Sequence, residues 1–474
     1  MKKILLFLLF FSLTLCACGE KLMPETSGDS FKYSIRNGVA IVTGLKDTNI
    51  NEIRIPEKVE GYYVEEIGDS AFKASKLKKV IIPDCVKTIG ESAFEESRAL
   101  REVSYVKNSG VVTIGDRAFY GCSLLEKVII GKNVESIGTD AFRNLNFNKA
   151  FVVDKNNKYY SEMDGLLYNK DQTILYQYPS SYDGEFNLPN TLLDIEPYAF
   201  EGSKVYSVVL PNSVVKIGES AFKDCFHLTN LQLSNSLEEI GNYFAYNTNL
   251  SNLTIPESVK SIDQYSLSMS FLQWVEFLGD VPKMKGKLSG FSCGAILVQD
   301  EYYDNYFTSD LFSKYNNYVY KKSDIHNDAI IKDNVLVKYV GNKSQYVIPV
   351  GITEISNYAF FAARSLSRVD IPDSVKKIGE KAFLTTSLTE VDLASVEEIG
   401  SSAFMQCILL KKAYIPNTIT KIGEDAFYGC STNQSKATLY FEASSFDEAF
   451  NREDGTGNKC SIVYNVTRED YRGK

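Results

Sequence analysis

The stretch IGESAFEESRALREVSYV begins at Ile89, and a near copy, IGDRAFYGCSLLEKVII, begins at Ile114. A third copy, IGTDAFRNLNF, begins at Ile137, so successive copies start 25 and 23 residues apart. Self-similarity at a nearly fixed period of this length is typical of a solenoid, in which each copy forms one coil. One coil buries too few apolar side chains to fold alone, so each copy needs a similar neighbour on either side.

The same pattern recurs through most of the chain. Aligned on the Ile that precedes Gly in most copies, the first series starts at Ile67, Ile89, Ile114, Ile137, Ile195, Ile217, Ile240 and Ile262, and the second at Ile355, Ile378, Ile399 and Ile422. In ten copies an Ala-Phe pair follows, with the Phe five positions after the Ile: Phe72, Phe94, Phe119, Phe142, Phe200, Phe222, Phe360, Phe383, Phe404 and Phe427. The other two copies have Phe244 one position early and Leu267 in place of the Phe. Because the rings recur once per coil, we expect them to form an internal aromatic column.

Behind the Phe runs a second pattern, L-x-x-V-x-I-P-x-x-V, as in LKKVIIPDCV from Leu77 and LSRVDIPDSV from Leu366. The V-x-I alternation has the period of two that a half-buried strand shows. The Pro ends the strand because it cannot donate to a ladder. The Gly after the aligned Ile suits a tight turn. Glu196, Asp263 and Ser356 replace it in three copies, so a left-handed backbone is not obligatory there.

The stretch IGDRAFYGCSLLEKVIIGKNVESIG, from Ile114, resembles the BspA-type leucine-rich repeat of bacterial surface proteins. The resemblance covers most of the chain from about residue 31 onwards. It implies a leucine-rich repeat solenoid: β-rich, right-handed, with short strands, short helical or 3-10 turns, and a parallel sheet along one face. The family's A-F-x-x-C/N position, which faces a packed turn, is matched by Cys122, Cys225, Cys407 and Cys430. This favours buried free thiols over a redox or zinc site.

The series of copies breaks twice. In the first break, DGLLYNKDQTILYQYP from Asp164 has two alternating runs around Asn-Lys-Asp, which predicts a β-hairpin. Related segments start at Phe31 and Ile330, and would cover the open edge of each series. In the second break, EYYDNYFTSDLFSKY from Glu301 has apolar residues at near-helical spacing. The resemblance implies a helical cap there, with one side formed by Tyr303, Phe307, Leu311 and Phe312.

These breaks predict two stacked arrays with hairpin and terminal caps. We expect a lipoprotein signal peptide over 1–17, a tether over 18–30, array one with its cap over 31–323, and array two with its cap over 324–474. We expect residues 321–327 to join the two arrays flexibly.

The N-terminus MKKILLFLLFFSLTLCACGE has two lysines, then an apolar run from Ile4 to Leu15 that is too short to span a bilayer. This is typical of a secretory signal. Its end, LCAC, resembles a bacterial lipobox, in which a small residue precedes the lipidated Cys. Ala17 before Cys18 fits this pattern, whereas Leu15 before Cys16 does not. The resemblance implies lipidation of Cys18; the alternative is an ordinary cleaved signal with incidental cysteines.

The composition argues against several functional classes. The formal net charge is -9, and no basic stripe indicates a nucleic-acid partner. Only His227 and His326 could serve a His-dependent metal centre or catalytic relay. No phosphate-binding glycine motif follows a strand. The sequence therefore predicts no catalytic residues, no metal site and no cofactor, and favours a protein that is not an enzyme.

The outward positions of the V-x-I strands are the candidate binding surface. They carry mixed residue types, which suits recognition of an irregular protein or glycan surface. The candidates are Trp274, Glu276, Arg368, Asp370, Glu390, Asp392, Lys412 and Tyr414. Asp370, Glu390 and Asp392 could form an acidic patch, or simply a solvated polar face. Trp274, the single tryptophan, could anchor a partner or cover the last coil of array one.

Together these features predict a lipid-anchored, non-enzymatic protein of the bacterial cell envelope, exposed at the surface. Its two expected partners are the membrane, through the lipid on Cys18, and an extracellular protein or glycan, as for an adhesin. A structural envelope scaffold and a surface protein that captures glycans or nutrients are the alternatives.

Overall fold

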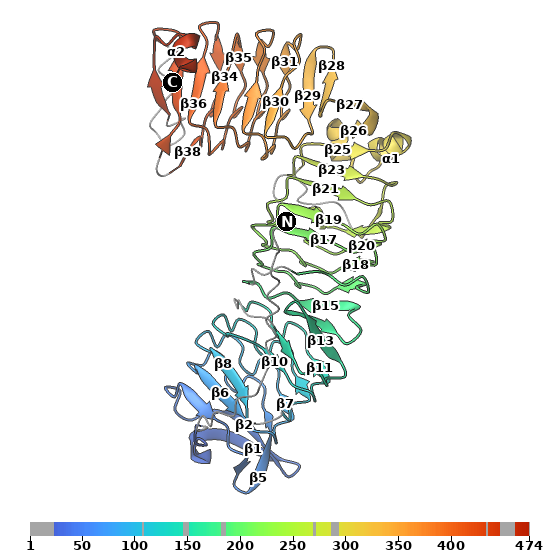
Figure 1. The fold of residues 1–474 in the computed structure, drawn as a ribbon, viewed down its shortest axis with the longest axis vertical. Helices are drawn as coiled ribbons and strands as arrows, with labels where there is room; N and C mark the ends of the chain where they lie inside the picture. Colours follow the sequence, from blue (N-terminus) through green and yellow to red (C-terminus); the bar gives the residue numbers. More distant parts are fainter. Residues whose placement is uncertain are drawn as a thin grey trace, which may run out of the picture.

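The computed structural model describes residues 23–106, 109–145, 151–181, 186–268, 272–285, 293–432, 435–445 and 460–473. They form an elongated solenoid of stacked coils that bends at an elbow near its C-terminal third (Figure 1). The predicted fold class, a β-rich leucine-rich repeat solenoid, is confirmed by these stacked parallel strands. Cys18, the predicted lipidation site, lies outside the described residues.

Each coil contributes strands to two parallel ladders. In the first ladder the short strands end at or next to the aligned Ile, and these Ile residues pair in register, as Ile67 does with Ile89. In the second ladder the V-x-I segment forms the strand, and Val80 pairs with Val103. The sequence predicted the second strand but not the first. Both ladders place apolar residues of successive coils in contact. An insertion or deletion in one coil would shift these residues out of register, so the repeat period varies little along the chain.

The first ladder runs through three sheets. The first sheet contains β1 (Phe31–Arg36), β2 (Val39–Leu45), β4 (Lys58–Val59), β5 (Tyr62–Ile67), β7 (Thr88–Ile89), β9 (Thr113–Ile114) and β11 (Ser136–Ile137). The second contains β13 (Tyr160–Met163), β14 (Leu166–Asn169), β15 (Ile174–Gln177), β16 (Asp194–Ile195), β18 (Lys216–Ile217), β20 (Glu239–Ile240), β22 (Ser261–Asp263) and β24 (Lys283–Lys285). The third contains β27 (Ile325–His326), β28 (Ala329–Lys332), β29 (Val335–Tyr339), β31 (Glu354–Ile355), β33 (Lys377–Ile378), β35 (Glu398–Ile399) and β37 (Lys421–Ile422).

The second ladder is divided into shorter sheets. In the N-terminal half these are β3 (Glu52–Arg54) with β6 (Lys79–Ile82) and β8 (Glu102–Tyr105), β10 (Ile129–Ile130) with β12 (Val152–Val153), and β17 (Ser207–Val209) with β19 (Asn230–Gln232). Next come β21 (Asn252–Ile255), β23 (Trp274–Phe277), β25 (Ile296–Val298) and β26 (Val319–Lys321). The last are β30 (Gln345–Val347) with β32 (Arg368–Asp370), and β34 (Glu390–Asp392) with β36 (Lys412–Ile415), β40 (Thr438–Phe441) and β41 (Ser461–Val463). A short pair, β38 (Ser431–Thr432) and β39 (Ser435–Lys436), projects from the last coils.

Antiparallel hairpins start all three sheets of the first ladder, as the sequence predicted for residues 31, 164 and 330 onwards. They are β1–β2, β13–β14–β15 and β28–β29, and the last strand of each continues into the parallel ladder. The hydrophobic core correspondingly forms three large clusters. We call the coils around them the first, second and third stacks. The middle hairpin serves two of them, because Leu166 packs in the second cluster and the next residue, Leu167, in the first.

Left-handed backbone occurs at two fixed places in every coil that starts from an aligned Ile, other than the one from Ile262. The positions are three and seven residues after the Ile, as at Ser402 (φ 55°) and Gln406 (φ 57°) in the coil from Ile399. Most of these residues are not glycine, so the local strain is balanced by packing between coils. The Gly that follows the aligned Ile is not among them.

That Gly is needed because neighbouring coils approach closely. A Cβ on Gly400 would lie 2.5 Å from the backbone N of Glu380 and 2.6 Å from the backbone C of Gly379, in the coil before it. The tight-turn explanation from the sequence is therefore replaced by a steric one. Ser356 and Glu196 occupy the same place in coils that directly follow a hairpin, where the preceding element differs. Asp263 occupies it in the coil from Ile262, whose backbone also differs, because it lacks the left-handed residue three positions after the Ile.

Replacing Gly400 with alanine is expected to lower the free energy of unfolding by about 1–3 kcal/mol, because backbone atoms must move to admit the Cβ. The urea midpoint of the full-length protein measures this. Ser356→Ala is the matched control, since this position already carries a Cβ, and it should change little. Equal midpoints for the two variants would contradict the steric explanation.

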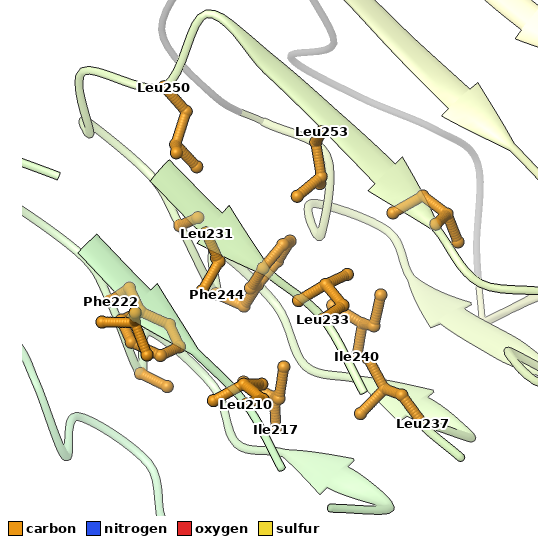
Figure 2. Packing of buried hydrophobic residues seen from close by; sticks show 14 of the residues in the cluster. Leu210, Ile217, Phe222, Leu231, Leu233, Leu237, Ile240, Phe244, Leu250 and Leu253 are labelled. Carbon is orange, nitrogen blue, oxygen red and sulfur yellow. The ribbon is translucent and has the colours of Figure 1, made fainter. Parts of the chain in front are cut away.

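The predicted aromatic column is present in all three stacks. In the third, Phe360, Phe383 and Phe404 stack with ring centroids 4.7 Å and 4.9 Å apart and interplanar angles of 8° and 4°. The hairpins extend two of the columns, because Tyr178 stacks on Phe200 and Tyr339 on Phe360. Figure 2 shows the same packing in the second stack, where Phe222, Ile217 and Leu210 lie beneath Phe244, Ile240 and Leu233 of the next coil.

The four cysteines at the repeat position are buried, and each thiol donates to the Phe carbonyl of the preceding coil. The Sγ–O distances are 3.1 Å for Cys122 to Phe94, 3.0 Å for Cys225 to Phe200, 3.1 Å for Cys407 to Phe383, and 2.9 Å for Cys430 to Phe404. Ser97 makes the same bond with its hydroxyl. None of these four cysteines forms a disulfide, as the sequence predicted for this position.

Short helical elements cap the second stack, where η2 (Asp300–Tyr302), α1 (Tyr303–Thr308) and η3 (Ser313–Tyr318) follow β25. Tyr306 and Phe312 are fully buried. Phe307, which was expected on the packed side, is exposed. Helix α1 is only six residues long, and its single buried residue is Tyr306, which packs where Phe307 was expected. Two further 3-10 turns are η1 (Gly28–Ser30) and η4 (Lys322–Asp324), and the chain ends in α2 (Arg468–Arg472).

The elbow between the second and third stacks is a packed joint. Within the segment expected to be a flexible link, β27 pairs with β28. Gln273, buried at the end of the second stack, donates its amide to the carbonyls of Tyr339 and Gly341 at 3.2 Å and 3.0 Å. A small apolar cluster of Ala295, Leu297, Ile330 and Val340 closes the same contact. The described residues at this joint are therefore held by specific contacts.

Candidate functional site: the elbow cleft

Turns and strand starts of the second and third stacks face each other on the inner side of the bend (Figure 1). Their side chains line a cleft there. We call it the elbow cleft. Its volume is about 1040 Å³. The second stack contributes Thr229, Asn230, Asn249, Ser251 and Asn252, and the third contributes Asn342, Arg364, Ser365, Thr385, Thr386, Ser387, Gln406, Ile408, Leu409, Tyr428 and Gly429.

The repeat explains which positions reach the cleft. Most of the third-stack residues come from the turn between the aromatic column and the V-x-I strand, which projects along one edge of every coil. In three coils of the third stack, the residue that directly follows the buried repeat position, which is Cys407 in the coil from Ile399, lines the cleft. These residues are Arg364, Ser387 and Ile408. The column and the left-handed residues hold these turns at the spacing of the coils, so successive turns present a row of side chains.

The lining is polar but almost uncharged. Asn, Gln, Ser and Thr side chains supply most of it, and these groups both donate and accept hydrogen bonds. Two aliphatic side chains, Ile408 and Leu409, remain 57% and 48% exposed at its wall beside Tyr428. No lining residue is acidic. The cleft thus offers neutral hydrogen-bonding groups next to a small apolar platform.

Arg364 supplies the single charge of this lining. Its Nη1 donates to Asn249 Oδ1 at 2.8 Å, across the elbow, and more weakly to the carbonyl of Leu250 at 3.5 Å. Burial lowers the pKa of the guanidinium from its ordinary value, which still leaves it charged at neutral pH. Among the residues that the structure describes, no carboxylate forms an ion pair with Arg364.

A continuation of the cleft runs along the second stack. A hollow of about 340 Å³ shares Thr229, Asn230 and Asn252 with it and adds Gln232, Asn235 and Thr254, again without a charged side chain. Asn230 donates to Ser207 Oγ at 2.8 Å, which orients its amide. The two hollows together form an extended, neutral polar groove with the guanidinium at the elbow.

The family profile of the BspA type leucine rich repeat region matches residues 44–163, 178–288 and 330–451, with 6 copies. This chain belongs to the BspA-type leucine-rich repeat family. The matched ranges take in all three stacks and both sides of the elbow cleft, and they agree with the resemblance seen in the sequence.

Several solved structures are similar to this BspA-type chain. A leucine-rich repeat protein from Bacteroides ovatus is 22% identical with a TM-score of 0.43, and the match covers 93% of this chain and 100% of that one. The pneumococcal vaccine antigen PcpA is 19% identical with a TM-score of 0.43, covering 63% and 96%. A leucine rich cell surface protein from Faecalibacterium prausnitzii is 23% identical with a TM-score of 0.29, covering 95% and 97%. No curated protein sequence gives a significant match.

The eight predicted surface residues of this leucine-rich repeat protein do not line the elbow cleft. Arg368, Asp370, Glu390 and Lys412 lie on β32, β34 and β36, where they form ion pairs of 3.0 Å (Arg368–Asp370) and 3.2 Å (Lys412–Glu390). These pairs balance two members of the expected acidic patch. The four residues form a mixed-charge face on the outside of the third stack.

The other four predicted residues are occupied by contacts within the chain. Trp274 packs against the apolar cluster of the elbow joint. Glu276 is buried and forms an ion pair with Lys322, with 2.8 Å between Oε1 and Nζ. Asp392 accepts ion pairs from Arg468 and Arg472 at 2.9 Å each, and Tyr414 is buried against the ring of Tyr471. Helix α2 covers this part of the sheet, which the sequence did not reveal.

The cleft itself was missed by the sequence analysis, which considered only the outward strand positions. A signal was present in the turns, because CIL from Cys407 places two aliphatic residues and FAARS from Phe361 an arginine where solvent exposure is expected. The described residues contain no group of three or more His, Cys, Asp or Glu side chains placed to hold a metal ion. None of the helices in the described ranges has the length and apolar composition that a bilayer crossing requires.

Proposed function

We propose that this protein binds an extracellular macromolecule at the surface of a bacterial cell and acts by binding and not by catalysis. The observation that carries the proposal is the elbow cleft, in which two packed stacks present rows of exposed polar side chains on a fixed frame. Membership of the BspA-type leucine-rich repeat family supports it. A similar structure is described as a leucine rich cell surface protein.

The proposal includes the two-array organisation, over 31–323 and 324–474, and a lipid anchor on Cys18. The bend lies where the two proposed arrays meet, so the cleft depends on both (Figure 1). A specific macromolecular contact buries about 1,200–2,000 Å² in total. Two arrays meeting at an elbow offer more concave surface for such a contact than one straight array.

Binding is tested with the full-length protein displayed on intact cells. Protease added outside should cleave it, and cells that carry it should bind immobilised host-matrix proteins or glycans more than cells that lack it. Protection from the protease would contradict surface display. Full cleavage without any gain in binding would instead favour the structural scaffold.

Replacing Cys18 with alanine is expected to release the protein from membrane pellets into the soluble fraction. Acyl chains on this Cys would hold the protein through about 0.8 kcal/mol per buried CH₂, and the variant has no thiol at this position to carry them. Fractionation followed by immunoblotting measures the loss. Cys16→Ala is the matched control, because Leu15 before it does not fit the lipobox, and it should pellet like the natural protein. Continued pelleting of the Cys18 variant would contradict lipid anchoring.

A further inference from the structure

We infer that the elbow cleft binds a carboxylate-bearing oligosaccharide, with Arg364 as the residue that recognises the acidic sugar. The inference rests on the proposed binding function and narrows it to one class of ligand. It depends on three observations: a cation without a carboxylate partner, a neutral hydrogen-bonding lining, and an exposed aliphatic platform.

The first observation is that the guanidinium of Arg364 has no carboxylate partner among the described residues. A guanidinium has five N–H donors in a planar fork that matches a carboxylate with two parallel hydrogen bonds. In the described structure only Nη1 has partners, at Asn249 and Leu250. Other basic side chains of the third stack do pair with a carboxylate, such as Lys377 with Glu354 at 2.9 Å and Lys381 with Glu380 at 2.8 Å. The protein has a net charge of -9, and the guanidinium of Arg364 is a position inside a cleft where an anionic ligand can form charge-assisted hydrogen bonds.

The second observation is the lining around this cation. Sugar hydroxyls donate and accept hydrogen bonds at the same atom, and the side-chain amides of Asn230, Asn252 and Gln406 can both accept from and donate to them. Acidic side chains, which would repel a carboxylate, are absent from the lining of both hollows. The groove continues for several side chains along β19 and β21, which suits a chain of sugars more than a single small anion.

The third observation is the platform of Ile408 and Leu409. Both side chains are about half exposed although they are aliphatic, and they lie in the wall of the same cleft. A pyranose ring has an apolar C–H face that packs on such a surface while its hydroxyls bind the polar wall. The lining holds a single aromatic residue, Tyr428, whereas the buried centre of a protein interface is enriched in aromatic residues.

The test is direct binding of defined probes to the full-length protein in detergent micelles, measured by calorimetry. The acidic probes are hyaluronan hexasaccharide, tetragalacturonate and 3′-sialyllactose. Their neutral counterparts are the carboxyl-reduced forms of the same three oligosaccharides, which differ from the acidic probes only in the carboxylate. An acidic peptide of six glutamates represents the protein class. We expect at least one acidic sugar to bind about tenfold or more tightly than its neutral counterpart, and more weakly at high salt because the charge is screened.

Arg364→Gln should weaken the acidic probe about 10- to 100-fold, the loss expected for charge-assisted hydrogen bonds, and leave the neutral probe little changed. Arg364→Lys keeps the positive charge but lacks the planar set of N–H donors that can bind both carboxylate oxygens. It should therefore bind the acidic probe more tightly than Arg364→Gln and more weakly than the natural protein. Arg368→Gln is the matched control, since this arginine lies outside the cleft and pairs with Asp370, and its binding should equal the natural protein's. Thermal unfolding of each variant checks that the elbow remains folded.

Three results with the natural protein would overturn the inference: no acidic sugar binds, neutral and acidic sugars bind equally, or the peptide binds more tightly than every sugar. Equal losses in Arg364→Gln and Arg368→Gln would also overturn it. Its failure is separable from failure of the proposed function, because cells could still bind a matrix protein under surface display. In that case the chain remains a surface binding protein with a ligand other than an acidic sugar.

Discussion

Replacing Phe383 with alanine is expected to lower the free energy of unfolding of the third stack by about 3–5 kcal/mol. The ring is fully buried and lies between Phe360 and Phe404, at centroid distances of 4.7 Å and 4.9 Å. Truncation removes the transfer free energy of the ring and leaves a cavity in the middle of the column. Stacked pairs add about 0.5–1.5 kcal/mol each beyond area burial, and both pairs are lost together.

The measurement is urea unfolding of the full-length protein, with hydrogen exchange of β31, β33 and β35 to assign the change to the third stack. Phe226→Ala is the matched control, because this ring is 60% exposed and should contribute less than about 0.5 kcal/mol. If Phe383→Ala and Phe226→Ala unfold at the same urea concentration, the column does not hold the stack together. In a repeat protein the loss should spread to the coils on either side, since each is stabilised by its neighbours.

Lys338→Met is expected to stabilise the protein by about 2–4 kcal/mol near pH 6, an effect that shrinks as the pH rises. Lys338 lies on β29 at the elbow joint, and its side chain is buried. Its Nζ donates to the carbonyl of Tyr358 at 2.5 Å, and no ion pair to it is found among the described residues. Burial lowers the pKa of Lys338 to about 7. A buried ammonium without a counter-charge costs free energy, which a methionine of similar shape avoids.

The sign follows from proton binding in the two states. An unfolded lysine titrates near pH 10.4, so between about pH 7 and 10 the unfolded state binds one proton more than the folded state at this residue. Stability from this group therefore rises with pH through that window and is lowest below pH 7. The thiol of Cys293, which faces the lysine, stays neutral there because burial raises its pKa to about 12. The carbonyl of Tyr358 keeps a donor in the variant, the backbone N–H of Phe361.

The measurement is the difference in free energy of unfolding between Lys338→Met and the natural protein at pH 6, 7, 8 and 9, which cancels the titration of groups common to both. Lys421→Met, at an exposed lysine of β37, is the control and should show a small difference at every pH. A gain that stays constant with pH would mean that Lys338 binds the same number of protons in the folded and unfolded states over this range, so that burial does not lower its pKa.

Much of the architecture was predictable because the contacts that build a coil are repeated. The aligned Ile, the Phe five residues later and the V-x-I alternation each recur once per coil. Each of these residues therefore contacts a residue of the same type in the next coil. Paired Ile residues such as Ile378 and Ile399, and stacked rings such as Phe383 and Phe404, follow directly from that period. The hairpins were predictable from short alternating runs around turn residues.

The positions of the repeat glycines could be read from the sequence, but their role could be assigned only from the tertiary structure. The spacing of Gly400 from Ile399 is plain in the sequence, but whether it serves a turn or a close approach depends on the distance to the preceding coil. The strand at the aligned Ile was missed because two residues are too few for a recognisable alternation.

The sequence by itself determined the coil, its internal column, the buried thiols and the places where the series is interrupted, because these depend on neighbours one period away. Only the tertiary structure decided which surfaces are free. Helix α2 places Arg468 on Asp392, 76 residues earlier, and the elbow brings Arg364 to Asn249, 115 residues earlier. The elbow contact depends on the angle at which a hairpin docks on the last coil before it, and the α2 contact depends on the path of the chain after β41. No local period encodes either, and so neither the covered sheet face nor the cleft could be foreseen from the repeat.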